Sequence, residues 1–160
     1  MDALAIINKY YPEDNELKHI LLTHSRSVAD KALWIAGKHP ELNLDKQFLE
    51  EAAMLHDIGI FMTDADGICC FGSYSYICHG YLGADLMRKE GFPRHALVCE
   101  RHTGAGISLQ SIIDQQLPVP HRDMVQFIIF RIIFINDSKC VHSQLNSYFC
   151  AILQNNHHIL

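Results

Sequence analysis

The chain has 160 residues, of which 49% are hydrophobic, so it is long enough for one domain with a substantial core. Its formal net charge is −5 and it has no basic tract, which argues against nucleic-acid binding through a patch that follows the phosphates. The first residues lack the basic and then apolar pattern of a signal peptide, and no run of about 18 apolar residues suggests a membrane span. These patterns predict a cytoplasmic protein.

Helical spacing of apolar residues predicts a first helix over residues 3–11, which Pro12 ends. A second helical pattern begins at Asn15, either continues or restarts after Thr23, and ends near Gly37 and Pro40. Asp45 is a favourable N-cap and predicts a third helix through Leu55, with Gly59 as its C-terminal signal.

In the second half of the chain, glycines and an Asp-x-Asp-Gly turn predict a loop over residues 61–77 that borders the site. Helices are predicted over residues 79–90, ended by Gly91, and from Pro93 to about His102. Residues 103–123 read as a long connection with one short helical turn at 109–114.

The last 37 residues differ in composition from the rest, because their only charged residues are Arg131, Asp137 and Lys139. The stretch 125–135 is almost wholly apolar; propensity favours a strand there, whereas its context favours a helix. This composition is compatible with a buried helix, an interface or an altered reading frame, and the sequence does not choose between them.

Cysteines and histidines are the residues most suited to special chemistry. The chain is not a short secreted one and has no CxxC pair, so we interpret its six cysteines as reduced and mostly buried thiols. Eleven histidines are many for this length, and histidine is the commonest metal ligand. The six cysteines are Cys69, Cys70, Cys78, Cys99, Cys140 and Cys150.

The strongest local signal is the pair His56-Asp57 at the end of an apolar helix. Adjacent helical residues point about 100° apart, but at a helix end both side chains can bend toward one ion. An imidazole with a carboxylate suits zinc, iron or manganese better than calcium. The remaining ligands must come from other helices, and the candidates are His24, His79, His102 and Asp137.

Structural interpretations compete with these assignments. A lone helical histidine is more often a hydrogen-bonded core or surface residue than a ligand. Asp57 could cap a neighbouring turn and Asp137 could be a turn residue. The arginines Arg26 and Arg101 could each bind a phosphate oxygen of a substrate or simply lie at the surface. The other histidines are interpreted as surface, tail or structural residues: His19, His39, His95, His121, His142, His157 and His158.

The order His, His-Asp, His, His, Asp resembles the HD-domain phosphohydrolase superfamily, specifically its HDIG-type members. The resemblance is carried by THSRSVADKAL around His24, by MLHDIGI, by ICHGYLGADLMRKEG from Ile77, and by CERHTGAGISL around His102. It is strongest over residues 15–123 and implies a single HD domain over residues 1–160, with 124–160 as an atypical tail.

The resemblance implies an all-α, compact helical bundle with a metal site at its centre and an atypical apolar C-terminal segment. It assigns His24, His56, Asp57 and Asp137 to a first divalent ion, and His79 and His102 to a second. One or two ions of iron, manganese, zinc or magnesium are therefore expected. Asp57, His79 and His102 would be the catalytic residues.

The implied activity is hydrolysis of a nucleotide or another small phosphate ester by metal-activated water. Three alternatives stay open: a catalytically impaired HD module that binds metal or nucleotide, a di-iron HD oxygenase, and a histidine-rich helical domain without a site. The expected partner is a small phosphorylated substrate, with neither nucleic acid nor membrane. An exposed apolar tail would favour a homodimer.

Overall fold

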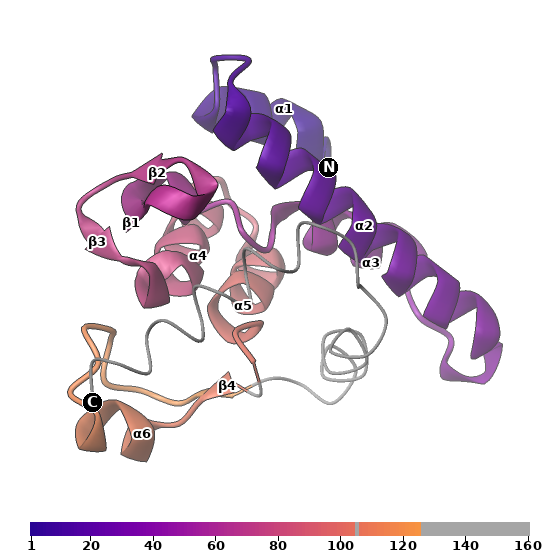
Figure 1. Ribbon diagram of the computed structural model, residues 1–160. Helices are drawn as coiled ribbons and strands as arrows, with labels where there is room; N and C mark the ends of the chain where they lie inside the picture. The colour runs from indigo at the N-terminus through magenta and orange to yellow at the C-terminus, as the bar shows by residue number, and fades with distance from the viewer. Residues whose placement is uncertain (105, 126–160) are drawn as a thin grey trace.

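Helices that converge on one central turn build the part of the fold that carries the site (Figure 1). The computed structural model describes residues 1–104 and 106–125. Within these residues there are six α-helices. Their bounds are Ala3–Tyr10 for α1, Glu16–Lys38 for α2, Lys46–Leu55 for α3, His79–Lys89 for α4, Pro93–Arg101 for α5 and Leu109–Asp114 for α6.

Side chains at the N-caps explain where the first three helices begin. Asp2 accepts a hydrogen bond from the backbone N–H of Ala5, Asn15 from Lys18, and Asp45 from Phe48. Each cap satisfies a backbone donor that has no partner inside the helix. The second helical pattern continues through Thr23 without a break, so α2 is one helix of 23 residues.

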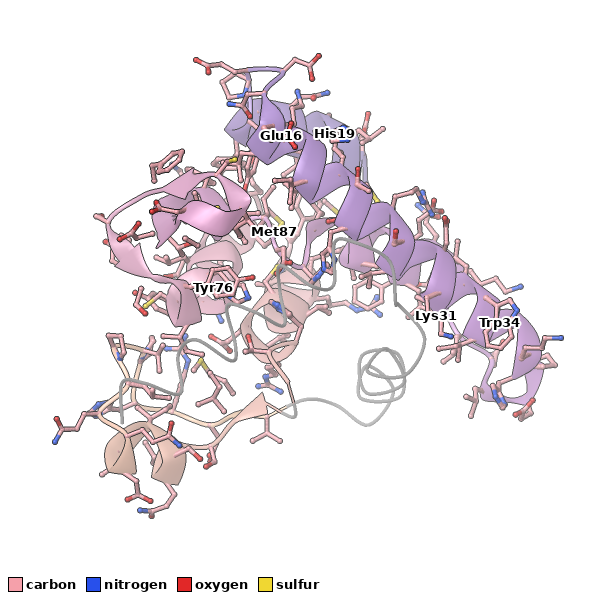
Figure 2. The ribbon with its side chains drawn as sticks, in the orientation of Figure 1. Glu16, His19, Lys31, Trp34, Tyr76 and Met87 are labelled. Atoms are coloured by element: carbon pink, nitrogen blue, oxygen red, sulfur yellow. The ribbon has the colours of Figure 1, made fainter. Side chains whose placement is uncertain are left out.

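The core lies where α1 and α2 pack on one side of α3 and its following turn, and α4 and α5 on the other. Ile7, Leu21, Leu55 and Ile58 are fully buried there. Burying such a side chain contributes about 1.5–3 kcal/mol. Figure 2 places Met87 of α4 in this interior.

The outer side of α2 carries polar and aromatic residues instead. Trp34 is exposed there, with the Lys31 ammonium 4.9 Å from the centre of its ring (Figure 2). The opposite side of the same helix end buries Ala32, Ile35 and Ala36 against α3 and α5. The helix is therefore amphipathic along its length.

The predicted loop over residues 61–77 is more ordered than expected. It contains strands β1 (Thr63–Ala65), β2 (Cys70–Phe71) and β3 (Tyr74–Ser75) in the order β2-β1-β3, with β1 antiparallel to β2 and parallel to β3. The segments β4 (Gly106–Ile107) and β5 (Met124–Val125) form a second, antiparallel pair. Strands of two or three residues are too short to show an alternating pattern, so the sequence did not indicate them.

The predicted all-α class is confirmed, because helices dominate the described residues and strands are few and short. The short helical turn predicted at 109–114 is α6. The conformation predicted for 125–135 lies, beyond Val125, outside the described residues, so the single domain over 1–160 stays a prediction. Among the described helices, none combines the length and the apolarity needed to cross a membrane.

Candidate metal centre

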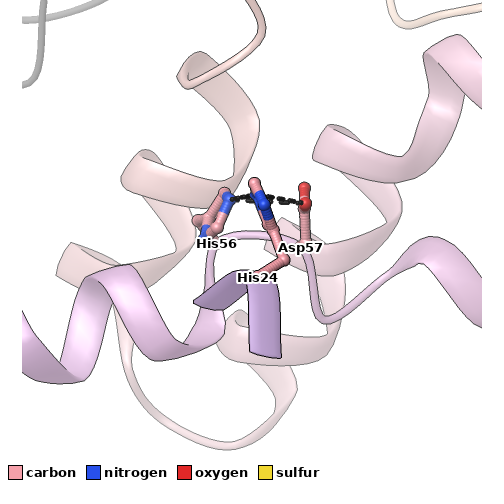
Figure 3. Close-up of side chains that lie close together, drawn as sticks. All are labelled: His24, His56 and Asp57. Carbon is pink, nitrogen blue, oxygen red and sulfur yellow. Dashed lines mark hydrogen bonds and ion pairs between the residues drawn. The ribbon is translucent and has the colours of Figure 1, made fainter. Parts of the chain in front are cut away.

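The turn after α3 brings His56 and Asp57 to one point in the middle of the bundle. Helix α3 ends at Leu55, and the next hydrogen bonds run from Ile58 N–H to the Leu55 carbonyl and from Ile60 N–H to the Asp57 carbonyl. This tight winding aims two consecutive side chains at the same region. Figure 3 shows both beside His24, which comes from the middle of α2.

Three ligand atoms from these residues form a first group. The Nε2 atoms of His24 and His56 lie 3.1 Å apart. Asp57 Oδ2 lies 3.4 Å from His24 Nε2 and 3.3 Å from His56 Nε2.

The other oxygen of the same carboxylate belongs to a second group. Asp57 Oδ1 lies 3.4 Å from His79 Nε2 and 3.0 Å from His102 Nε2. The two imidazole Nε2 atoms are themselves 3.0 Å apart. His79 is the first residue of α4 and His102 follows the last residue of α5. Asp57 thus presents one oxygen to each pair of histidines, so one carboxylate links two candidate ion positions.

These separations fit ligands that share an ion. Nitrogen and oxygen ligands about 2.1 Å from a zinc-like ion, at angles of about 90–109°, are about 3.0–3.4 Å from one another. The distances within both groups fall in this range. Both groups are therefore of the right size for a divalent transition-metal ion.

The ring orientations also fit metal binding. The Nδ1–H of His56 donates to the Ala53 carbonyl at 2.6 Å, that of His79 to Tyr76 at 2.6 Å, and that of His102 to Cys99 at 2.7 Å. A neutral imidazole whose Nδ1 carries the proton presents a lone pair on Nε2. Backbone carbonyls often hold metal-ligating histidines in this way.

The pKa values of the buried side chains also favour metal binding. Asp57 is fully buried by its surroundings, and burial alone would raise its pKa, but His56 and His102 hold the pKa well below its usual range. Burial lowers the pKa of His24 and of His79 to about 4, although the Asp57 charge opposes this shift. At neutral pH His24 and His79 are therefore neutral imidazoles beside an ionised Asp57. Asp57 Oδ1 accepts no hydrogen bond within the described part of the chain, which leaves a buried anionic oxygen for a cation.

Glycines let the ligand-bearing segments approach one another. A Cβ atom added to Gly59 would overlap the His79 carbonyl oxygen and lie 2.5 Å from Gly83 N, and one added to Gly80 would lie 2.8 Å from the Cys99 carbonyl oxygen. The role expected for Gly59 as a C-terminal helix signal is only part of the explanation. Its φ of −86° is available to any residue, so space rather than backbone freedom requires glycine here.

The structure brings five of the six predicted ligands together, and Asp137 lies outside the described residues. The predicted substrate-binding Arg26 of α2 forms ion pairs with Asp30 of the same helix and with Glu50 of α3. Arg101 ends α5 beside His102, and its Nε is buried. The roles of Arg26 and Arg101 in binding a phosphate stay predictions.

His95 is not the surface residue that the sequence suggested. It is 8% exposed and its Nε2 lies 3.2 Å from a Glu51 carboxylate oxygen. His95 lies on α5 and precedes its C-cap, His102, by seven residues, so the two residues lie on the same side of the helix. This seven-residue spacing is the feature of the sequence that could have indicated a buried His95. Tyr76 belongs to the segment 61–77 that was predicted to border the site, and its ring stacks on that of His79 with centroids 4.6 Å apart.

Comparisons with known proteins agree with this geometry. The family model described as HD domain matches residues 21–123, which contain all five ligands of the two groups. The chain therefore belongs to the HD domain family, in a superfamily of metal-dependent hydrolases.

Two relatives are informative. An uncharacterized protein of Methanocaldococcus jannaschii is 34% identical over 117 residues, which are 72% of this chain and 60% of that protein. A tRNA (cytidine(56)-2'-O)-methyltransferase of Picrophilus torridus is 29% identical over 127 residues, which are 73% of this chain and 33% of that enzyme. The chain thus spans less than two thirds of the length of either relative. No solved structure gives a significant match.

Proposed function

We propose that the chain is a metal-dependent phosphohydrolase that acts on a nucleotide or another small phosphate ester. The observation that carries the proposal is the division of the Asp57 carboxylate between two histidine pairs. A divalent ion held there would lower the pKa of water from about 16 to about 7 and would neutralise phosphate oxygens. Phosphate esters need both effects, because their own oxygens repel a nucleophile.

The chain's residues are suited to hold such ions at neutral pH. Asp57 stays ionised, and the lowered pKa values of His24 and His79 keep these rings neutral. Each group offers two imidazole nitrogens and one carboxylate oxygen, which leaves further coordination positions for water or substrate. A mixed nitrogen and oxygen set suits iron, manganese or zinc better than calcium or magnesium.

The exposure of the ligands indicates where a substrate would enter. The His24 side chain is 26% exposed, whereas those of His56, Asp57, His79 and His102 are at most 8% exposed. We therefore expect the phosphate group to approach over His24. In this proposal Asp57 orients the attacking water, and His79 and His102 form the inner group or supply a proton to the leaving group.

The proposed substrate is a small phosphorylated molecule in the cytoplasm rather than a nucleic acid. The name of the Picrophilus torridus relative describes methyl transfer to tRNA, but the match covers only 33% of that enzyme. Methyl transfer is therefore not part of the proposal. A homodimer is compatible with the proposed function, and the oligomeric state in solution tests it.

The test begins with metal content. The protein is purified without chelator, and bound metals are measured by elemental analysis in the wild type, Asp57→Asn and Asp64→Asn. Asp64 is the matched control, because it is an exposed carboxylate on β1 that belongs to neither ligand group. We expect one or two ions per chain, lost in Asp57→Asn and kept in Asp64→Asn.

The loaded protein is then tested on a panel of nucleoside monophosphates, dinucleoside polyphosphates, cyclic dinucleotides and small phosphate esters. Phosphate release that requires metal and Asp57 would support the proposal. Tight metal or nucleotide binding without turnover would favour an impaired HD module instead. Metal that survives in Asp57→Asn would show that the site is wrongly assigned.

A further inference from the structure

We infer that Tyr11 is a positioning residue for the metal centre, because its hydroxyl fixes the turn that carries Asp57. Tyr11 directly follows α1 and precedes residue 21, where the family match begins. The inference rests on the proposed function only in that the centre binds a metal ion. It adds a contribution of the C-cap of α1 to a site whose described candidate ligands all lie within residues 21–123.

The geometry joins one hydroxyl to both sides of the turn. Tyr11 Oη donates to the Ile58 carbonyl at 2.9 Å and accepts from the Phe61 N–H at 3.3 Å. The Tyr11 ring meets the Phe61 ring edge-on, with centroids 5.2 Å apart. Ile58 is the residue after Asp57, so the hydroxyl acts one peptide away from the carboxylate that both ligand groups share.

The burial of Tyr11 stabilises its two hydrogen bonds to the turn. Tyr11 is only 4% exposed, so water does not readily replace the hydroxyl as a partner of the two backbone groups. Burial raises its pKa well above the usual value, so the hydroxyl keeps its proton and remains a donor. Tyr11 also belongs to the main hydrophobic core, in which α1 packs against α3.

Small displacements of this turn matter for the ligand distances. The separations around Asp57 span only 3.0 to 3.4 Å. Constellations of this kind tolerate shifts of about 0.5 Å before their geometry is lost. Freeing the Ile58 carbonyl and the Phe61 N–H would let the turn rotate and carry Asp57 away from one pair of histidines.

The neighbouring Tyr10 offers a matched control. Its hydroxyl donates to Glu90 at 2.6 Å, and its ring stacks on Phe61 with centroids 6.3 Å apart. Tyr10→Phe therefore removes the same atom from the preceding residue, whose ring contacts the same phenylalanine. It leaves the hydrogen bonds to the turn intact.

The experiment titrates metal-free full-length protein with Co²⁺, whose visible absorption reports the ligands and the coordination number. The wild type, Tyr11→Phe and Tyr10→Phe are compared by Co²⁺ dissociation constant, by visible spectrum and by thermal unfolding. We expect Tyr11→Phe to raise the dissociation constant about 10-fold or more and to change the spectrum. Tyr10→Phe should leave both at their wild-type values.

A loss of thermal stability alone would not support the inference, because any buried tyrosine can contribute to packing. An unchanged spectrum and dissociation constant in Tyr11→Phe would overturn it. If the wild type binds no Co²⁺, the proposed function fails, and amide hydrogen exchange then decides about Tyr11. Faster exchange of the Phe61 amide in Tyr11→Phe alone would support the inference that the Tyr11 hydroxyl fixes the turn. Equal exchange in all three proteins would overturn that inference.

Discussion

The Nε2 atoms of His79 and His102 lie 3.0 Å apart, although both rings donate their Nδ1–H groups to backbone carbonyls. A ring whose only proton is on Nδ1 has a lone pair on Nε2, so two such rings would face each other through lone pairs beside the buried Asp57 oxygen. A cation between them would convert a repulsive contact into an attractive one. The fold thus holds an arrangement that is unfavourable without a bound ion, and its stability should depend on metal.

The first prediction concerns this dependence. Adding Mn²⁺ or Zn²⁺ to the metal-free protein should raise the free energy of unfolding by about 2.7 kcal/mol when free metal is about 100 times the dissociation constant. Urea unfolding with metal or with chelator measures the difference. His102→Gln should lose most of the increase, whereas His121→Gln, at an exposed position outside both groups, should keep it. An equal increase in His102→Gln would show that the ions bind elsewhere.

The second prediction concerns the close approach at Gly59. Gly59→Ala should lower the free energy of unfolding by about 1–3 kcal/mol and weaken metal binding, because the added methyl group meets the backbone of α4. Gly37→Ala is the control, because nothing lies within 4 Å of a Cβ atom there and alanine favours a helix. It should leave stability unchanged or raise it by up to about 1 kcal/mol. Urea unfolding and metal titration check both variants, and an unaffected Gly59→Ala would contradict the packing argument.

Local signals made the helices predictable. The caps Asn15 and Asp45, the proline at Pro93 and the glycine at Gly91 act within a few residues of where they stand, so helix bounds follow from them to within one or two residues. Gly91 adopts a φ of +85° just after α4, as a C-terminal signal should.

The sequence indicated which described residues lie together at the candidate site, but not the distances between them. The His-Asp pair and the order of the other histidines singled out the five residues that the structure brings together. The resemblance also assigned His24, His56 and Asp57 to one ion and His79 and His102 to a second, and the structure places them in the same two groups, which share Asp57. The distances within the groups follow from the packing of α2, α4 and α5 around the turn, which no local pattern encodes. Tyr11 was expected only as an apolar position of a helix, because its partner Ile58 is 47 residues away in the chain.

The third prediction is a pH dependence that arises from His95. Burial lowers the pKa of His95 below 6.5, and the hydrogen bond to Glu51 only partly offsets this shift. The unfolded chain therefore binds a proton more readily than the folded one as the pH falls below about 6.5, so the stability that neutral His95 provides is present above this pH and is lost below it. In chelator, the free energy of unfolding measured between pH 7.5 and pH 5 should fall less steeply in His95→Gln than in the wild type. Equal slopes would mean that His95 gains its proton equally well in both states.

The fourth prediction concerns the buried Glu100, which accepts hydrogen bonds from Arg88 at 2.8 Å and from the Nε of Arg122 at 3.2 Å. These arginines hold the pKa of Glu100 below its usual value against the effect of burial, which would raise it. Arg88→Ala and Arg122→Ala each leave the Glu100 carboxylate with one arginine partner. Because both arginines are partly exposed, each substitution should lower the free energy of unfolding by about 1 kcal/mol or less. The double variant leaves the buried Glu100 charge without either arginine. Its loss of unfolding free energy should exceed the sum of the two single losses by a coupling energy of about 1–3 kcal/mol. Arg94→Ala, which removes a guanidinium that lies over the Phe48 ring, controls for the loss of a positive charge on α5. Additive losses in a double-mutant cycle by urea unfolding would contradict the shared role of the two arginines.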